Sequence, residues 1–361
     1  MTLPLGIFSP PGEPARVGAR HGDRVLDLSA VARAGSRDLL ATPSLNRLMA
    51  AGPEAWAAVA ALGDAPDHAL AGVALHAPFT VADYVDFYSS LEHATNLGRL
   101  FRPDAEPLLP NWRHLPVGYH GRAGTVVPSG TPIVRPSGQA KPPGADAPSF
   151  GPSRRLDIEL ELGFVIGLPS RLGEPVPVER ALDHVFGLVL VNDWSARDIQ
   201  AWEYQPLGPF LGKSFATSIG HWVVPPAAFR RVPGPPQEPE PLPYLREEPW
   251  AFDIPLEVEL DGHVVSRTNA RHLYWSVAQQ IAHLTANGAS LRTGDLLVSG
   301  TISGPGREER GSFIELTWNG AEPIELPGGA ARTFLEDGDE VVLRNADLGE
   351  VRGRIEPPSA R

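Results

Sequence analysis

The chain has 361 residues, a formal net charge of -12 and no cysteine. Its length exceeds that of a usual single domain, so we expect a small domain joined to a larger one. The acidic balance argues against a nucleic-acid or anionic-membrane surface, because both need a dense field of Lys and Arg. The absence of cysteine excludes disulfides, thiolate nucleophiles and cysteine-bound metals, so any metal would have oxygen or nitrogen ligands.

The composition and the apolar pattern predict a globular protein of the cytoplasm. Hydrophobic residues make up 42% of the sequence and charged residues 20%, which is typical of chains that fold by themselves. The amino-terminal segment lacks the basic and apolar regions of a secretory signal. No apolar run approaches the length of about 18 residues that suggests a membrane span.

The first part of the chain predicts a small domain of strands followed by helices. Residues 15–28 contain two strand-like stretches on either side of a His-Gly-Asp turn, which predicts a hairpin. Two helices are expected next, one with Ser44 as its N-cap and one with Pro53 in its first turn. We place the domain boundary where the sequence changes character, which assigns 1–78 to an N-terminal domain and 79–361 to a C-terminal domain.

The second part predicts a β-rich domain, because Gly and Pro punctuate short apolar stretches from residue 83 onward. A helix is expected at 269–287, where apolar residues recur at spacings of 4, 4 and 3 before Gly288. Strands are expected at 295–299, 312–318 and 339–344. The proline-dense segments, which we expect to form surface loops, are 136–153 and 225–249.

In the stretch 156–162, carboxylates alternate with aliphatic residues. This period of two predicts a strand with Asp157, Glu159 and Glu161 on one face. Neighbouring carboxylates roughly 6–7 Å apart repel by about 2–3 kcal/mol at an effective dielectric of about 20. The acidic face therefore requires a cation, an arginine or open water.

A second stretch, 254–260, shows the same alternation with Glu257 and Glu259 ahead of an Asp-Gly turn. Open water is a sufficient partner for an acidic strand face at the surface. Alternation alone therefore does not distinguish a metal-binding strand from a solvated one.

The run 192–217 follows a buried-looking strand at 186–191 and is dense in polar groups that bind oxyanions and metals. It begins with Asn-Asp, and closely spaced polar residues follow, namely Arg197, Gln200, Tyr204 and Lys213. The alternative interpretation is a capped helix start, with Asp193 or Ser195 as the N-cap. In that case Arg197 would pair with Asp198 at the surface.

A third polar cluster lies at 83–102. It offers a potential metal ligand in Asp86, a hydroxyl donor in Tyr88, a base in His93 and an anion clamp in Arg102. Each is ordinary by itself, because a lone histidine is more often a structural residue than a catalyst. The same limit applies to the pair Tyr119 and His120.

Together these stretches resemble the fumarylacetoacetate hydrolase family over most of the chain, from about residue 83 to 340. The motifs are Asp83-Tyr-Val-Asp-Phe-Tyr-Ser-Ser with His93, Pro110-Asn-Trp through Gly118-Tyr-His-Gly-Arg122, Leu156-Asp-Ile-Glu-Leu-Glu, Asn192-Asp-Trp-Ser-Ala-Arg-Asp, Gly208-Pro-Phe-Leu-Gly-Lys-Ser-Phe and Ser299-Gly-Thr-Ile-Ser-Gly. The resemblance implies a mainly β (α+β) homodimer with a small N-terminal SH3-like barrel and a larger mixed β-sandwich roll that holds the site. The N-terminal domain and the C-terminal tail are shorter than is usual in the animal enzymes of this family.

The resemblance also implies a divalent cation, calcium or magnesium, which oxygen ligands suit. The implied ligands are Asp86, Glu159, Glu161 and Asp193. A second cation, which the family can hold beside the first, would lie at Asp193, Thr217 and the backbone of Lys213.

Further roles follow from the resemblance motif by motif. The implied substrate contacts are Tyr88, Arg102, Tyr119, Gln200, Tyr204 and Thr301. His93 is implied as the general base, with Glu315 as its orienting partner. Arg197, Gln200 and Lys213 are implied to meet the oxyanion or to protonate the leaving carbon.

The implied reaction is hydrolysis of a 1,3-diketo acid, fumarylacetoacetate, to fumarate and acetoacetate, which is the last step of tyrosine and phenylalanine breakdown. Each step of such a reaction builds negative charge, so a metal and cationic residues suit it. Two alternatives remain open at this stage. One is another activity of the superfamily, an acylpyruvate hydrolase, an oxaloacetate decarboxylase or an isomerase. The other is a metal-binding relative without catalysis.

Overall fold

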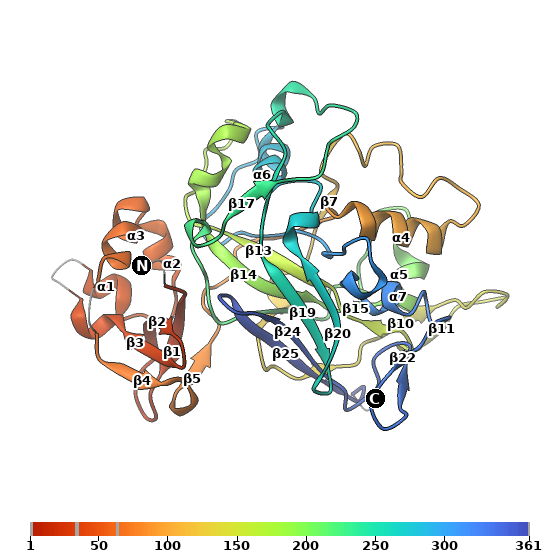
Figure 1. Cartoon of the computed structure of the whole chain (residues 1–361), viewed down its shortest axis with the longest axis horizontal. Helices are drawn as coiled ribbons and strands as arrows, with labels where there is room; N and C mark the ends of the chain where they lie inside the picture. Colours follow the sequence, from red (N-terminus) through yellow and green to blue (C-terminus); the bar gives the residue numbers. More distant parts are fainter. Residues whose placement is uncertain (1–2, 33–35, 63–64, 360–361) are drawn as a thin grey trace.

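The computed structural model describes residues 3–32, 36–62 and 65–359. A small N-terminal unit lies beside a larger body built mostly of strands (Figure 1). The N-terminal sheet has the order β4-β3-β2-β1-β5. Its strands are β1 (Leu5–Ser9), β2 (Arg16–His21), β3 (Arg24–Asp27), β4 (Asp67–Ala69) and β5 (Ala74–His76), and the helices beside it are α1 (Arg37–Leu40), α2 (Asn46–Ala50) and α3 (Pro53–Ala60).

The N-terminal predictions are largely confirmed. Strands β2 and β3 pair antiparallel and form the expected hairpin, and Pro53 is the first residue of α3. The N-cap of α2 was predicted one residue too early, because the capping position is Leu45. Ser44 instead accepts a hydrogen bond from the Asn46 N–H at 3.3 Å.

The larger body is built around two large sheets. The first has seven strands in the order β7-β6-β21-β13-β14-β16-β8. They are β6 (Tyr84–Phe87), β7 (Gly118–His120), β8 (Val126–Pro128), β13 (Leu160–Ile166), β14 (Val185–Asp193), β16 (Thr217–Ile219) and β21 (Leu296–Val298). The second has the order β20-β19-β24-β25-β9. Its strands are β9 (Ile133–Val134), β19 (Pro255–Leu260), β20 (His263–Asn269), β24 (Glu340–Asn345) and β25 (Gly349–Glu356).

Strand β14 shows why the sheets pack as they do. Leu188 and Leu190 belong to the core between the two sheets, because β14 packs against β24 and β25. Val189 and Val191 point to the opposite face and join the core of the N-terminal unit. Both faces are covered, so the strand is apolar along most of its length, and each buried Leu or Val contributes about 1.5–3 kcal/mol. The predicted mainly β fold is confirmed.

The remaining elements are short. The two-stranded pairs are β10 (Ser137–Ala140) with β11 (Ser149–Pro152), β12 (Leu156–Asp157) with β15 (Ser195–Ala196), β17 (Arg231–Pro233) with β18 (Trp250–Phe252), and β22 (Ile324–Glu325) with β23 (Ala331–Arg332). The helices of the body are α4 (Leu91–Phe101), α5 (Arg197–Glu203), α6 (Val277–Thr285) and α7 (Phe313–Leu316). Among the described residues, no helix is both long enough and apolar enough to cross a membrane. The domain boundary at residues 78/79 stays a proposal.

The helix predicted at 269–287 is wrong in its first half, because α6 begins only at Val277. Ser276 and Gln279 form a capping box that starts the helix there. Asn269 still belongs to β20, and the Tyr274 N–H donates to a carbonyl just before α4 at 2.9 Å. Tertiary hydrogen bonds therefore keep the segment before Ser276 out of the helix.

Two strand predictions also need correction. Residues 312–318, expected as a strand, contain the short helix α7, whose first N–H groups find a buried acceptor in Asp157. The acidic stretch 156–162 is interrupted, since β12 ends at Asp157 and β13 begins at Leu160. The strands expected at 295–299 and 339–344 are present as β21 and β24.

Candidate active site

The register of the seven-stranded sheet brings polar residues from distant segments to one end of it. Asp86 on β6 lies opposite Tyr119 on β7 and, on its other side, opposite Val298 of β21. Strand β13 follows and contributes Glu161, and β14 next to it ends in Asp193, which lies opposite Thr217 of β16. The strand order thus places polar side chains from five strands at the same end of the sheet.

Thr301 reaches this end of the sheet because the chain makes a tight turn directly after β21. Gly300 has φ +78°, and a Cβ there would lie 2.2 Å from the Phe87 carbonyl oxygen. Only glycine permits this close approach of two backbones in the left-handed region. The chain then continues with the Ile302 N–H donating to the Leu160 carbonyl at 2.8 Å.

The four predicted metal ligands lie together. Asp86, Glu159, Glu161 and Asp193 each offer a carboxylate oxygen, these oxygens lie within 4.8 Å of one another, and all four residues are buried. Three of the buried oxygens have no hydrogen-bond partner among the described residues: Oδ1 of Asp86 and both carboxylate oxygens of Glu161. Buried carboxylate oxygens without donors fit a hard divalent cation, for which they are the preferred ligands.

The charges of this cluster are only partly compensated by the protein. Lys213 Nζ contacts Glu159 and also Asp193 Oδ2, the latter at 2.7 Å. Thr217 Oγ1 donates to Asp193 Oδ1 at 2.8 Å. Arg197 also contacts Glu159 at 2.8 Å, but it is shared with Asp157, so the four carboxylates keep negative charge that a divalent cation would offset.

The electrostatics of the cluster separate its carboxylates into two groups. Burial raises the pKa of Asp86 well above its usual range, and the charge of Asp193 adds to the effect. Burial does the same to the pKa of Glu161, with Asp86 adding to it. Burial alone would also raise the pKa of Glu159, but Lys213 and Arg197 hold that pKa well below its ordinary value. Asp86 and Glu161 are therefore the carboxylates that lack a positive partner.

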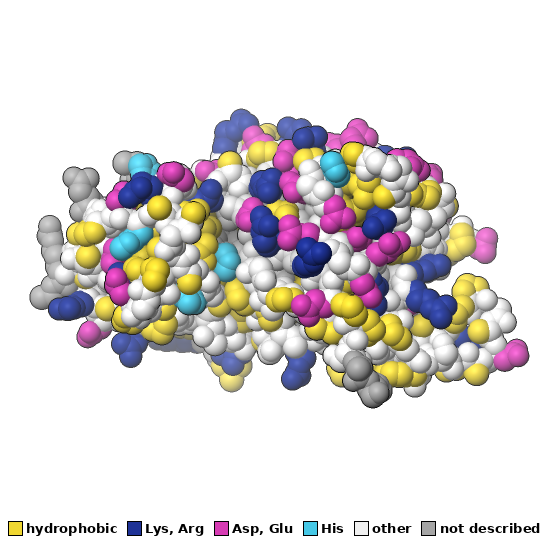
Figure 2. Space-filling model, turned by 90° about the horizontal axis from the view of Figure 1, so that it is seen from below, with side chains coloured by type: hydrophobic (Ala, Val, Ile, Leu, Met, Phe, Trp, Pro, Cys, Tyr) yellow, Lys and Arg dark blue, Asp and Glu magenta, His cyan; other side chains and the backbone are white. Residues whose placement is uncertain are grey.

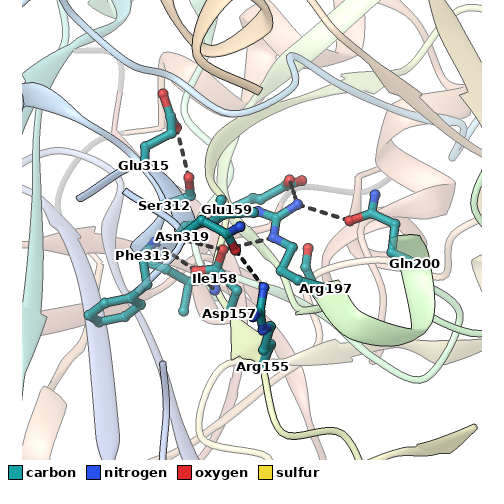
Figure 3. A network of polar contacts seen from close by, with 12 residues as sticks. Arg155, Asp157, Ile158, Glu159, Arg197, Gln200, Ser312, Phe313, Glu315 and Asn319 are labelled. Carbon is teal, nitrogen blue, oxygen red and sulfur yellow. Dashed lines mark hydrogen bonds and ion pairs between the residues drawn. The ribbon is translucent and has the colours of Figure 1, made fainter. Parts of the chain in front are cut away.

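Arg197 is buried, and the alternative in which it pairs with Asp198 at the surface is wrong. Its Nε contacts Asp157 Oδ2 at 2.7 Å, and one Nη contacts Glu159 Oε1 at 2.8 Å and Gln200 Oε1 at 3.1 Å (Figure 3). The N-cap alternatives for this segment are wrong as well. Helix α5 has Ala196 at its capping position and no side-chain cap.

His93 and Glu315 form a buried pair although 222 residues separate them in sequence. Their Nδ1 and Oε2 atoms are 2.6 Å apart. Three further donors hold the carboxylate, namely Asn96 at 2.9 Å, Ser303 at 2.9 Å and Ser312 at 2.7 Å. Burial opposes ionisation, but His93 and the hydrogen bonds from Asn96 and Ser312 lower the pKa of Glu315 to about 2. Glu315 is thus a carboxylate at neutral pH.

The other ring nitrogen of the histidine faces the carboxylate cluster. His93 Nε2 lies 3.9 Å from Glu159 Oε1. The imidazole ring of His93 packs against the ring of Tyr88. The two ring centroids are 5.3 Å apart, and the ring planes meet at 83°. Since Glu315 accepts the proton on Nδ1, Nε2 is the nitrogen with a free lone pair.

These groups open into a cavity of about 390 Å³. All six residues predicted as substrate contacts line it, as do Asp86, His93, Glu159, Arg197 and Lys213. The remaining predicted residues, which are Glu161, Asp193, Thr217 and Glu315, lie behind this lining. Arg102 donates to the Pro107 carbonyl at 2.7 Å, while its buried Nε has no partner among the described residues.

The second acidic strand has a different environment. Glu257 pairs with Arg267 at 2.7 Å, and Glu259 pairs with Arg344 at 2.9 Å. These are cross-strand pairs on the partly exposed face of the five-stranded sheet. Figure 2 shows basic and acidic side chains interspersed across the visible face of the molecule. Each of these two glutamates therefore has an arginine as its positive partner.

Sequence reasoning missed several residues that build the site. Asn96 lies three positions after His93 on α4, and this helical spacing was an available signal. Ser303 lies in the motif at 299–304, but neither it nor Ser312 was given a role, because only the fold brings both hydroxyl groups to Glu315. Asp157 was noticed only as part of an acidic face. Tyr84 is also buried beside the cluster, and burial raises the pKa of its phenol well above the usual value.

A buried carboxylate cluster next to a histidine–glutamate pair, at one end of a β sandwich, is the arrangement of a hydrolase that works with a divalent cation. Two family models match the chain. The model of the fumarylacetoacetate (FAA) hydrolase C-terminal region matches residues 83–356, and that of the fumarylacetoacetase N-terminal region matches residues 1–62. The chain belongs to the fumarylacetoacetate hydrolase family, whose members depend on a metal.

Similar proteins cover nearly the whole chain. The fumarylacetoacetase of Homo sapiens is 48% identical over 383 residues, which cover 96% of this chain and 91% of that protein. The fumarylacetoacetase of Arabidopsis thaliana is 44% identical over 399 residues, covering 98% and 94%. A solved structure, fumarylacetoacetate hydrolase from the psychrophilic Exiguobacterium antarcticum, has a TM-score of 0.62 at 20% identity and covers 98% of this chain and 99% of its own. At that identity the likeness shows the fold.

Proposed function

We propose that this chain hydrolyses the carbon–carbon bond of fumarylacetoacetate to give fumarate and acetoacetate, the last step of tyrosine and phenylalanine breakdown. The observation that carries the proposal is the His93–Glu315 pair, which faces the carboxylate cluster across one cavity. Relatives that are named fumarylacetoacetase and match this chain over nearly its whole length support this substrate over the other activities of the superfamily.

Asp86, Glu159, Glu161 and Asp193 would hold the divalent cation, with calcium or magnesium as the proposed ions. When bound, such an ion supplies Lewis-acid polarisation of the diketo oxygens and fixes the orientation of the substrate. A second cation at Asp193, Thr217 and the backbone of Lys213 remains part of the proposal. Both oxygens of Asp193 already accept hydrogen bonds from the side chains of Thr217 and Lys213.

His93 is the proposed general base. Nε2 takes a proton from water while the water oxygen attacks the ketone carbon next to the double bond. Glu315 keeps Nδ1 protonated and stabilises the imidazolium that forms. General-base catalysis of this kind is typically worth about 10²–10⁴-fold in rate.

The attack produces a tetrahedral oxyanion, for which Arg197 and Gln200 are the proposed donors. One Nη atom of Arg197 has no partner among the described residues, and Gln200 uses its Oε1 toward Arg197, which leaves its amide N–H groups available. The carbon–carbon bond then breaks, and its electron pair leaves with the acetoacetate fragment. Burial would lower the pKa of Lys213, but Asp193 and Glu159 raise it above its ordinary value, so Lys213 stays protonated and is the proposed donor to the leaving carbon.

The proposal is tested with purified protein and fumarylacetoacetate in the presence of calcium or magnesium. Hydrolysis should bleach the ultraviolet absorbance of the substrate, and His93→Ala should abolish turnover without weakening cation binding. Inactivity of the wild-type protein with either ion would refute the proposed reaction. Faster hydrolysis of acylpyruvates than of fumarylacetoacetate would favour a different member of the superfamily.

The proposed substrate contacts are the cavity-lining residues Tyr88, Arg102, Tyr119, Gln200, Tyr204 and Thr301. We also propose a homodimer in the cytoplasm. Light scattering during size-exclusion chromatography would measure the mass of the assembly, and a mass of one chain would contradict the dimer.

A further inference from the structure

Asp157 is a buried carboxylate outside the predicted site, and every lone-pair direction it offers is used. Its side chain is fully buried. Oδ2 accepts from Arg197 Nε at 2.7 Å and from the Ile314 N–H at 3.0 Å. Oδ1 accepts from the Phe313 N–H and from its neighbour Ile158, both at 2.7 Å. One carboxylate therefore joins a side chain on α5 to the first turn of α7.

Each of these two partners leads directly to a group of the proposed mechanism. On one side, Arg197 contacts Glu159 and Gln200 with the far end of its guanidinium. On the other side, Glu315 follows Ile314 by one residue and forms the pair with His93. Figure 3 shows Asp157 between these two arms of the network.

The planar guanidinium makes this contact an orienting one. Its nitrogens are fixed relative to one another, so the bond from Nε to Asp157 sets the plane in which both Nη atoms lie. One Nη is bound by Glu159 and Gln200, and the other has no partner among the described residues. Without the Nε contact the group can rotate about its stem, and the free Nη no longer keeps its direction.

We propose that Asp157 is a positioning residue that fixes the guanidinium of Arg197 and the α7 turn of Glu315 relative to each other. The inference rests on the proposed function for its kinetic consequences. It does not depend on a cation or on a change in protonation of Asp157.

Asp157→Asn tests the proposal with little change in volume. An asparagine has a single acceptor oxygen, so in either orientation its NH₂ group faces two of the four donors. We expect kcat for fumarylacetoacetate to fall by about 10–100-fold, as is typical for partners that orient site residues, while KM changes by less than about threefold. Measurements at saturating calcium, far below the melting temperature, exclude unfolding as the cause.

Asp198→Asn is the matched control. Asp198 is also a carboxylate that braces backbone, since it accepts from Ser153 Oγ at 2.6 Å and from the Arg154 N–H at 2.8 Å. It lies next to Arg197 in sequence, but no bond joins the two side chains. This variant should lower the melting temperature and leave kcat near the wild-type value. Equal losses of kcat in the two variants would reduce Asp157 to a structural role and overturn the proposal.

A double-mutant cycle with Arg197→Lys identifies the route of the effect. Lysine cannot offer the Nε contact, so Asp157→Asn should add little to the loss that Arg197→Lys causes. Effects that multiply fully in the double variant would show that Asp157 does not act through Arg197.

Hydrogen exchange provides a readout independent of activity, and it also decides the case if Asp157→Asn does not fold. In Arg197→Lys, the amides of Phe313 and Ile314 should exchange faster, because their shared acceptor loses its partner on α5. Gln200→Ala removes a neighbour of Arg197 that does not touch Asp157, so it should leave these amides protected. Unchanged protection in Arg197→Lys would refute the link even in a protein without hydrolase activity.

Discussion

Glu315→Gln removes one negative charge from the buried pair and tests how His93 is set up as a base. The pKa of Glu315 is about 2 against an ordinary 4.5, and burial by itself would have raised it. One pKa unit corresponds to 1.36 kcal/mol, so the environment as a whole favours the carboxylate by about 3 kcal/mol, and His93, Asn96 and Ser312 must also offset the opposing effect of burial. Glutamine keeps the shape of the side chain but provides only one acceptor oxygen for the donors around it.

We expect kcat of this variant to fall by about 10²–10⁴-fold with little change in KM, because His93 loses the group that stabilises its protonated form. The assay is the bleaching of fumarylacetoacetate absorbance at saturating cation. Stability should change with pH in a defined direction. A lowered pKa in the folded state stabilises the protein above pH 4.5, and this contribution is lost as the pH falls from 4.5 toward 2. The stability advantage of the wild type over Glu315→Gln should therefore narrow as the pH falls from 4.5 toward 2.

Glu92→Gln is the control for this experiment. Glu92 precedes His93 on α4, is half-buried, and has a pKa raised chiefly by burial, yet no hydrogen bond or ion pair joins its side chain to the His93 ring. Its substitution should leave kcat unchanged. A Glu315→Gln variant that retains kcat within about threefold of the wild type would refute the role of Glu315 as the orienting partner, since that role predicts at least a hundredfold loss.

Three further predictions concern the cation, the substrate and the core. Glu159→Gln should weaken calcium binding measured by titration calorimetry, whereas Glu257→Gln on the second acidic strand should not; equal effects would contradict the choice between the two strands. Arg102→Ala should raise KM by about tenfold or more, because its charged hydrogen bonds are worth about 1.5–3 kcal/mol, and a fall in kcat alone would place Arg102 outside substrate binding. Leu190→Ala should lower the free energy of unfolding, measured in urea, by about 2–5 kcal/mol, because Leu190 is fully buried between the two sheets. A loss below about 1 kcal/mol would mean that the core relaxes to fill the space that the leucine side chain leaves.

Local patterns predicted much of the fold and part of the site. The hairpin at 15–28 and the start of α3 at Pro53 were correct, because turn chemistry and the fixed φ of proline act within a few residues. The first half of the helix expected at 269–287 and the strand expected at 312–318 were wrong, because distant partners compete for the backbone there. For the strand, the competing partner is Asp157, whose carboxylate accepts the first N–H groups of α7.

The two acidic strands show the limit of local information most clearly. Glu159 and Glu257 occupy equivalent places in the same alternating sequence pattern, although the structure interrupts the first stretch at 158–159 and keeps the second as the continuous strand β19. The difference lies in what the fold puts opposite them. Glu257 faces Arg267 on the neighbouring strand, whereas Glu159 is brought to Asp86 and Asp193 by the register of the seven-stranded sheet.

The sequence by itself determined the mainly β class, the alternation of carboxylates with aliphatic residues around Glu159 and, through long motifs, the family. The resemblance implied that Glu315 orients His93, but only the tertiary structure decided the contact between them across 222 residues, the further donors that hold Glu315 and the way Asp157 joins Arg197 to α7. The physical reason is that turns, caps and alternation depend on neighbours along the chain. Which carboxylate meets a cation, an arginine or a histidine depends on strand order and register, which bring together segments that are distant in sequence.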